Sequence, residues 1–529
     1  MSAPARNHFL FWCAHEHIDF RIPEFESIAN FFDIRLKWIS GGPEPNKNKI
    51  HEPNGDIKGS LAFNCQNGKN QEVNPWVILE LPSEEIALKI CSRSISTKYC
   101  IHLWASATAR LELHALVQAF ISENREELED SYFNANVSFK LNIDAFMKKL
   151  PSSDKHERIE TFSYLPFQGP VSLQNPDVTL IELEFSGFDH NNLPEEPINL
   201  FFGRFVADGQ RELNAKFSLK KRCFIGNTSM DPQLSFLMAN LACVEKGSLM
   251  LDPFCGTGGL MLTAAWFGAY VLGTDIDYLT LHARTRPSRV NSGKKRASDE
   301  SLRKNFLQVG GKNLEGRLLG VTVADASNPP YRTNLGLYFD SIITDPPYGI
   351  REPAERVGIK HREALERPDD YKVPEEYLPF HIPQKIDYTL GNIYTDLLEF
   401  ASRHLILGGR LVFWIPVNRE HYACYQENTL PKHPLLKLIA NCEQVLSSHT
   451  SRRCITMQKF KEYKENIDEC EYLPGMANCD KNLIANNLDA VKVTTDKFKE
   501  QFFKPQEINR QERKERIKRY GHLNIEETI

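Results

Sequence analysis

A short motif in the second half of the chain has the residue types needed for chemistry on an amino group. It reads Asp345-Pro346-Pro347-Tyr348 and follows, after Thr344, an apolar run at 338–343 that predicts a buried strand. Ligands of open α/β sheets bind outside the carboxyl ends of such strands. The acid supplies hydrogen-bond acceptors, the tyrosine supplies a flat ring, and the prolines make the backbone at this edge rigid. This combination suits the amino group of a planar base. The competing interpretation is an ordinary Asp-Pro turn.

A glycine-rich loop upstream has the composition of a cofactor-binding turn. It joins a predicted strand at 248–251 to a predicted helix at 259–267, and its candidate binding residues are Asp252, Phe254, Gly256 and Gly258. Glycines let backbone amides approach a ligand closely, and a helix N-terminus favours a negative group. The spacing differs from the dinucleotide fingerprint, and no Walker lysine follows, which disfavours ATP hydrolysis. The alternative is a plain strand-to-helix turn.

Two further acids end predicted strands. Asp275, with Ile276 beside it, ends the strand after this loop, where a carboxylate grips ribose hydroxyls. Asp325, with Ala326 beside it, ends the next strand, in position to accept from an adenine amino group. Each acid alone is better explained as a solvated loop residue. Together with the glycine-rich loop they indicate a site for an adenosine-containing cofactor.

Composition narrows the class of protein. The chain has 529 residues, 41% hydrophobic and 25% charged, with a net charge of -5, which excludes a uniformly basic nucleic-acid binder. Its 12 cysteines include no Cys-x-x-Cys pair, so we expect no intrinsic metal site and a reducing compartment. No signal sequence or membrane span is predicted, and we expect a cytoplasmic protein.

The pattern of elements changes at Gly247. An α+β region precedes it, and strands alternating with helices follow, which predicts a doubly wound α/β sheet. The predicted units are an N-terminal α+β subdomain at 1–66, an α+β domain at 67–190, a linker at 191–222, an α/β domain at 223–462 and a polar tail at 463–529.

Three local predictions concern the second half. A helix at 394–407 should stop at Gly408 and Gly409. The polar stretch 284–301 resembles a surface insertion. The long, charged segment 351–388 is typical of a lid or a disordered loop.

The cofactor loop, the strand-end acids and the Asp-Pro-Pro-Tyr motif resemble class I S-adenosylmethionine-dependent amino-methyltransferases. Flanking segments narrow the resemblance to the catalytic subunit of eukaryotic and archaeal tRNA (guanine-10-N2)-methyltransferase; they are 202–212, 224–231, 344–352 and 447–453. The resemblance is weaker in the N-terminal half, where 93–104 matches best. It implies a THUMP RNA-binding domain at 67–190, S-adenosylmethionine as cofactor, tRNA as substrate and a small zinc-binding activator subunit as partner. Thr228 becomes a further candidate cofactor contact.

Candidate RNA contacts are basic residues, because no aromatic stripe of the RNP kind is present and recognition through shape and phosphates is expected. They are Lys220, Lys221, Arg222, Arg452 and Arg453. The alternative for the linker residues is a solvated charged face.

The expected chemistry follows from the substrate amine. The lone pair of guanine N2 is delocalised into the ring, and acceptors on its hydrogens stabilise the charge that develops during attack. Asp345 and the Pro346 carbonyl would be these acceptors, and Tyr348 would stack on the base. An amino-methyltransferase acting on rRNA or DNA is an alternative. A catalytically silent RNA-binding scaffold is another, but such a scaffold has no need for four intact strand-end acids.

Overall fold

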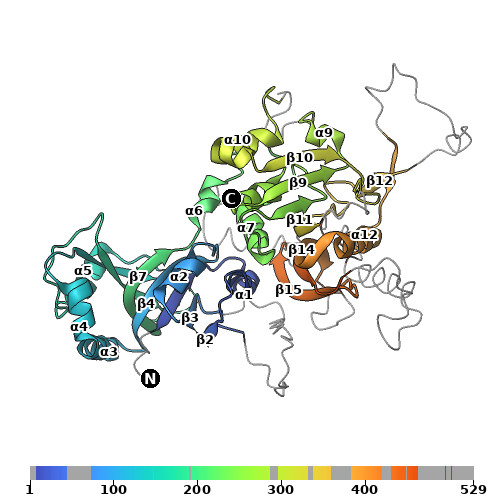
Figure 1. Cartoon of the computed structure of the whole chain (residues 1–529). Coiled ribbons are helices and arrows are strands. Elements are labelled where there is room, and N and C mark those ends of the chain that lie inside the picture. Colours follow the sequence, from blue (N-terminus) through green and yellow to red (C-terminus); the bar gives the residue numbers. More distant parts are fainter. Residues whose placement is uncertain are drawn as a thin grey trace, which may run out of the picture.

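The structure is a computed structural model. It describes residues 7–43, 73–146, 148–189, 192–285, 296–331, 338–358, 383–419, 430–447 and 449–462, together with Thr495, Phe498 and Phe502. The rest of the predicted tail and residues 359–382 of the predicted lid lie outside the described residues. Figure 1 shows two bodies, each built on one large sheet, with α1 (Arg21–Phe31) lying between them.

The N-terminal body is a seven-stranded sheet in the order β2-β3-β1-β4-β7-β6-β5. Its strands are β1 (His8–Cys13), β2 (Lys37–Ser40), β3 (Trp76–Glu80), β4 (Thr97–Ala107), β5 (Phe139–Ala145), β6 (Val178–Phe185) and β7 (Asn199–Asp208). Its helices are η1 (Ile18–Phe20), α1, α2 (Glu84–Cys91), α3 (Arg110–Glu123), α4 (Arg125–Leu128), η2 (Glu129–Phe133) and α5 (Ser152–Glu160). Alternating apolar side chains place one row of β1 under α1 and α2, with Phe9 and Phe11 packed on Phe25 and Ile28.

Strand β7 corrects the predicted linker. It lies inside 191–222, yet it pairs with β4 on one side and with β6 on the other. The predicted units at 1–66 and 67–190 therefore share one continuous sheet. Only the long-range pairing shows to which body this strand belongs.

The C-terminal body is a second seven-stranded sheet, in the order β10-β9-β8-β11-β14-β16-β15. Its strands are β8 (Leu249–Asp252), β9 (Tyr270–Asp275), β10 (Leu318–Val323), β11 (Phe339–Thr344), β14 (Leu405–Asn418), β15 (Leu436–Val445) and β16 (Thr450–Lys459). The strands up to β14 pair in parallel, whereas β16 is antiparallel to both β14 and β15. The predicted doubly wound sheet is thus confirmed, and it ends in a hairpin of β15 and β16.

Helices cover both faces of this sheet. They are α6 (Glu212–Lys216), α7 (Pro232–Leu241), α8 (Gly259–Trp266), α9 (Tyr278–Leu281), α10 (Leu302–Glu315) and α12 (Leu390–His404). One core cluster joins α7, α8 and α10 to Met250 and Ile343, and another joins α12 to the adjacent Leu251 and Ile342. Successive strand residues therefore point into opposite cores. No helix in the described part of the chain has the length and apolar character needed to span a bilayer.

The predicted helix stop at Gly408 and Gly409 is wrong. Helix α12 ends at His404, and both glycines lie within β14. Leu405 is buried and pairs with Phe339 at the start of β11. Tertiary pairing therefore extends the strand across the glycines, where local signals predict the end of a helix.

Buried Glu24 of α1 joins the two bodies. Its carboxylate accepts from the backbone amides of Ile95 (2.7 Å) and Ser96 (2.9 Å), and from Asn240 Nδ2 of α7 (2.8 Å). Asn240 Oδ1 in turn accepts from Arg93 Nε (3.0 Å), whose guanidinium lies 3.9 Å from the Phe267 ring centroid. These contacts fix the orientation of the first sheet relative to the second.

We expect Glu24→Ala to lower the free energy of unfolding by about 3 kcal/mol, because several buried donors lose their acceptor. The two bodies should then unfold in separate calorimetric transitions. Glu85→Ala is the matched control, since Glu85 forms only an exposed helical pair with Lys89 at 3.2 Å. A single transition at the control's midpoint would contradict the role of Glu24.

Candidate active site

The site lies where the order of parallel strands reverses, between β8 and β11. Asp252 ends β8, and its Oδ1 accepts from Thr344 Oγ1 at the end of β11 (2.7 Å) and from the Phe254 amide (3.1 Å). The two strands pair in parallel, so their carboxyl ends open on the same edge. In doubly wound sheets this reversal point is where ligands bind.

The glycine-rich loop is tied to the end of β9. Asp275 Oδ2 accepts from the Gly256 amide and Oδ1 from the Asp277 amide, each at 2.8 Å. Gly256 and Gly258 both have positive φ (49° and 76°). A Cβ at Gly258 would lie 2.7 Å from Leu302, whereas a Cβ at Gly256 would meet nothing within 4 Å. The loop thus needs glycine at 258 for packing and leaves open space beside 256.

Three carboxyl groups gather at this edge. Burial raises the pKa of Asp252 to about 7, and it also raises the pKa values of Asp275 and Asp345. The charges of Asp275 and Asp345 raise the pKa of Asp252 further. Buried acids that repel one another favour a cationic group among them. The sulfonium of S-adenosylmethionine is such a group, so the donor set fits the expected cofactor.

A cavity extends from this edge towards the end of β10. Its lining includes Phe254, Thr274, Asp325, Ala326 and Tyr331. Asp325 Oδ1 accepts from the Ser327 amide (2.8 Å) and Oδ2 from the Val357 amide (2.7 Å). Phe254 therefore lines the same cavity as Asp325 and Ala326.

The ends of the predicted lid form an ordered ribbon beside this cavity. Strands β12 (Glu355–Val357) and β13 (Lys385–Asp387) pair antiparallel, and β12 carries the Val357 amide that contacts Asp325. Thr228 Oγ1 also donates to Glu352 Oε1, just before β12, at 3.3 Å. The segment after the catalytic motif thus contacts two predicted cofactor residues.

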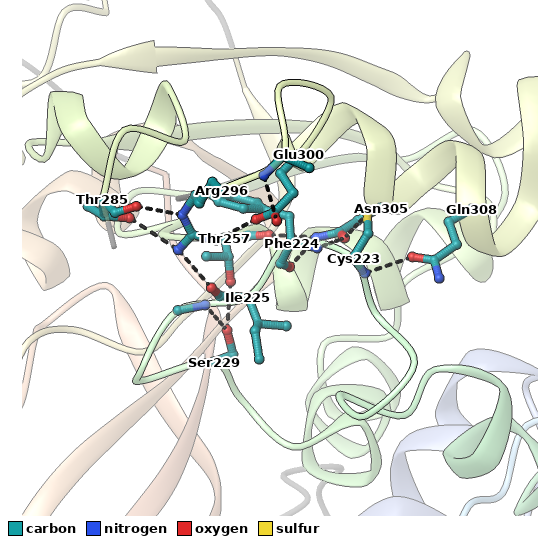
Figure 2. Close-up of polar contacts among 12 residues, drawn as sticks. Cys223, Phe224, Ile225, Ser229, Thr257, Thr285, Arg296, Glu300, Asn305 and Gln308 are labelled. Atoms are coloured by element: carbon teal, nitrogen blue, oxygen red, sulfur yellow. Dashed lines mark hydrogen bonds and ion pairs between the residues drawn. The ribbon is translucent and has the colours of Figure 1, made fainter. Parts of the chain in front are cut away.

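The segment 223–229 is held against the glycine-rich loop by residues far away in the sequence (Figure 2). Asn305 of α10 accepts from the Phe224 amide (3.0 Å) and donates to the Phe224 carbonyl (2.7 Å). Arg296 donates to the Ile225 carbonyl (3.1 Å). Ser229 Oγ lies 2.8 Å from Thr257 Oγ1 of the loop. The predicted surface insertion at 284–301 therefore contains a buried structural arginine.

Asp345 lies directly after β11, and two side chains share its carboxylate. The Tyr348 hydroxyl donates to Oδ1, and Arg452 Nη1 of β16 lies 3.3 Å from Oδ2. The Asp345 side chain is 21% exposed, so it is partly open to a ligand. Pro346 is buried, and Pro347 and Tyr348 are half-buried. The acid and the ring of the motif thus lie together.

Phe498, from the predicted tail, contacts the motif. Its ring lies edge-on to Tyr348, with centroids 6.4 Å apart, and is buried. Arg351 lies 5.9 Å from the Phe502 ring centroid. The spacing of these two phenylalanines gave no sign of such a contact.

The predicted RNA contacts separate into two groups. Lys220 and Lys221 are exposed, as phosphate contacts must be. Arg222 and Arg453 are buried; Arg222 donates to the Phe217 carbonyl (3.2 Å), and Arg453 lies 3.5 Å from Glu443. Arg452 lies behind Asp345. Burial removes the charges of these three arginines from solvent. The structure therefore argues against their predicted contacts with RNA.

Sequence reasoning missed several residues that shape the site. They are Thr344, Arg296, Asn305 and Gln444, the last of which accepts from Arg452 Nε at 2.6 Å. Thr344 adjoins the motif and could have been found as a polar residue ending an apolar strand. Asn305 and Gln444 carry no such local signal, because their partners are distant in sequence.

Asp252→Asn should gain stability relative to the unmutated protein as pH rises. Asp252 has a pKa of about 7 when folded against an ordinary 3.8, so the folded state holds this proton more tightly. The free energy of unfolding therefore falls between these two pH values, and the asparagine removes that fall. Denaturant titrations of the ligand-free protein from pH 4.5 to 8 measure the difference.

Asp299→Asn is the control, because Lys304 lowers the pKa of exposed Asp299, which titrates below this window. A constant stability difference between Asp252→Asn and the unmutated protein would contradict the electrostatic description.

The chain matches known families over both bodies. Residues 62–211 match the Tmrp11 THUMP N-terminal domain, a range that includes β7, and residues 220–365 match the RMKL-like methyltransferase domain. The predicted methyltransferase fold and THUMP domain are thereby confirmed.

Several relatives match most of this chain over most of their own length. A Xenopus laevis protein named tRNA (guanine(10)-N(2))-methyltransferase TRMT11 is 43% identical over 457 residues, which cover 86% of this chain and 85% of the relative. The mouse protein of that name is 42% identical over 467 residues, covering 88% and 91%. The Dictyostelium discoideum protein is 32% identical over 468 residues, covering 85% and 82%. The chain therefore belongs to the TRMT11 family of tRNA (guanine(10)-N(2))-methyltransferases.

Proposed function

We propose that this protein transfers a methyl group from S-adenosylmethionine to the N2 amine of guanosine 10 in tRNA, with Asp345 and Tyr348 at the reacting centre. The observation that carries the proposal is the acid and ring directly after β11, beside the acids of the glycine-rich loop. The relatives' names supply the substrate, and the residues supply the chemistry.

The cofactor contacts follow from the strand ends. When bound, S-adenosylmethionine supplies an electrophilic methyl group on a sulfonium. Asp275 and the Gly256 amide lie where ribose hydroxyls and the methionine moiety would be held, and Asp325 with Phe254 lines the adenine cavity. Asp252 contributes negative charge close to Asp345. Ile276 and Thr228 remain proposed contacts at the rim of this site.

Asp345 would act on the amine itself. Its carboxylate accepts a hydrogen bond from N2, and the Pro346 carbonyl accepts another, which favours attack because both stabilise the charge developing on nitrogen. The Tyr348 ring would stack on guanine, a contact worth about 1–3 kcal/mol. A paired target base must leave its stack to reach these groups.

The N-terminal body would hold the tRNA at a fixed angle to this centre. Glu24 and Arg93 fix the first sheet against α7, so an RNA bound there has a defined path to Asp345. Exposed Lys220 and Lys221 lie in the segment of the chain between β7 of the first body and α7 of the second, and they are proposed phosphate contacts. This arrangement favours a structured RNA over a small amine.

The function is tested by transfer of tritiated methyl from labelled cofactor to an unmodified tRNA transcript. We expect label in N2-methylguanosine at position 10, with Asp345→Ala reducing the rate at least about a hundredfold while cofactor affinity is retained. Parallel reactions contain rRNA fragments and duplex DNA. Preferred labelling of either of these would favour the rRNA or DNA alternative. No transfer to any of them would favour the silent scaffold.

We also propose a small zinc-binding activator subunit as partner, on the basis of family resemblance alone. Co-expression should then give a one-to-one complex with higher methyl-transfer activity than the separate chain. A monodisperse, fully active preparation without any partner would contradict this proposal.

A further inference from the structure

The Arg452 side chain is largely enclosed by other residues next to the proposed catalytic acid, Asp345. Arg452 lies on β16 opposite Pro416 of β14, and its side chain is only 14% exposed. Its guanidinium contacts Asp345 Oδ2 (3.3 Å), Gln444 Oε1 (2.6 Å), Met230 Sδ (3.3 Å) and the Trp414 ring, whose centroid is 4.1 Å away, and it also interacts with the Tyr348 hydroxyl. A side chain held on this many sides is built to have one orientation.

The two oxygens of Asp345 have different partners. Oδ2 faces Arg452 inside the protein, whereas Oδ1 faces the Tyr348 hydroxyl in the motif itself. A substrate amine needs an acceptor on the side that Tyr348 occupies, because that ring would stack on the base. Tyr348 can exchange its hydrogen bond for one from the substrate, and Arg452 retains its own.

We propose that Arg452 is a positioning residue that holds Oδ2 of Asp345, so that Oδ1 is presented to the substrate amine. This inference rests on the proposed function, in which Asp345 accepts from N2. It replaces the predicted role of Arg452 in contacting RNA phosphates.

Arginine suits this task better than lysine. Its planar guanidinium can donate to Asp345 and Gln444 in fixed directions while its face lies on Trp414, whereas an ammonium offers a single point of charge. Gln444 lies on the edge strand β15, paired directly with Arg452. The hairpin of β15 and β16 thus fixes the position of Arg452 and, through it, the orientation of the Asp345 carboxylate.

Arg452 also favours the ionised form of Asp345. Burial raises the pKa of Asp345, and the guanidinium charge acts against this rise. The other titratable groups facing the pair, from the elements that pack on it, are Tyr348, Tyr394, Asp252, Cys454 and His17. Loss of Arg452 should therefore move protonation of Asp345 to higher pH.

The test uses Arg452→Met and Arg452→Lys in the full chain, co-expressed with any partner that it requires. We expect Arg452→Met to lower kcat about a hundredfold, as misplacement of a reacting group does, with KM for tRNA changed less than about twofold. The acid limb of its kcat profile should move up by about one pH unit or more. Arg452→Lys should retain the acid limb and recover part of kcat.

Two other variants separate positioning from RNA contact and from misfolding. Lys221→Met should raise KM for tRNA without moving kcat or the acid limb, as loss of a phosphate contact does. Gln444→Ala removes the acceptor of Arg452 Nε from an edge strand and should lower kcat several-fold in the same direction as Arg452→Met. Cofactor affinity and thermal midpoint confirm that each variant is folded.

The outcomes test the positioning role of Arg452 and the proposed function separately. If Arg452→Met and Gln444→Ala both retain kcat and the acid limb, the positioning role is overturned. If Arg452→Met raises only KM for tRNA, Arg452 contacts RNA, as first predicted. A wild-type protein that methylates no tRNA would instead overturn the proposed function, and this inference with it.

Discussion

The carboxylate of Asp345, held between Tyr348 and Arg452 at the end of β11, is the interaction on which the site depends. A largely buried acid is costly unless its charge is matched, and here one cation and one hydroxyl each contact one of its oxygens. Arg452 lies on β16, which pairs antiparallel with β14. Its guanidinium therefore reaches Asp345 only when β16 has its observed register against β14. The candidate site therefore depends on both the doubly wound sheet and the hairpin of β15 and β16.

The same constraint explains the arrangement of the cofactor edge. Asp252 reaches across from β8 to Thr344, immediately before Asp345, so the cofactor loop and the motif share a hydrogen bond. Asp275 then ties the loop to β9. Each acid therefore has two functions, because it holds backbone in place and also contributes negative charge where a cationic cofactor would bind. Glu24 extends this rigidity to the N-terminal sheet through Asn240.

The sequence predicted the local part of this arrangement and missed most of the long-range part. Apolar runs followed by acids placed Asp252, Asp275, Asp325 and Asp345 at strand ends, and parallel pairing then brought them to one edge. Position along a strand therefore determines where these four acids lie, and their roles in binding and catalysis stay predictions.

Predictions that depend on distant partners were less successful. Arg452 was predicted to be a cation that contacts RNA, because the sequence shows only its polar neighbours. In the structure, Asp345 and Trp414 bury it. Arg296 lay in a polar stretch that resembled an insertion. Gly408 and β7 were assigned from local signals that strand pairing overrides.

A structure of the protein bound to tRNA and S-adenosylhomocysteine tests the central claim most directly. We expect guanosine 10 to be turned out of its stack, with the guanine ring stacked on Tyr348. Its N2 should lie within hydrogen-bond distance of Asp345 Oδ1, while Arg452 still contacts Oδ2. A target amine held by another acceptor, with Tyr348 still donating to Asp345, would contradict it.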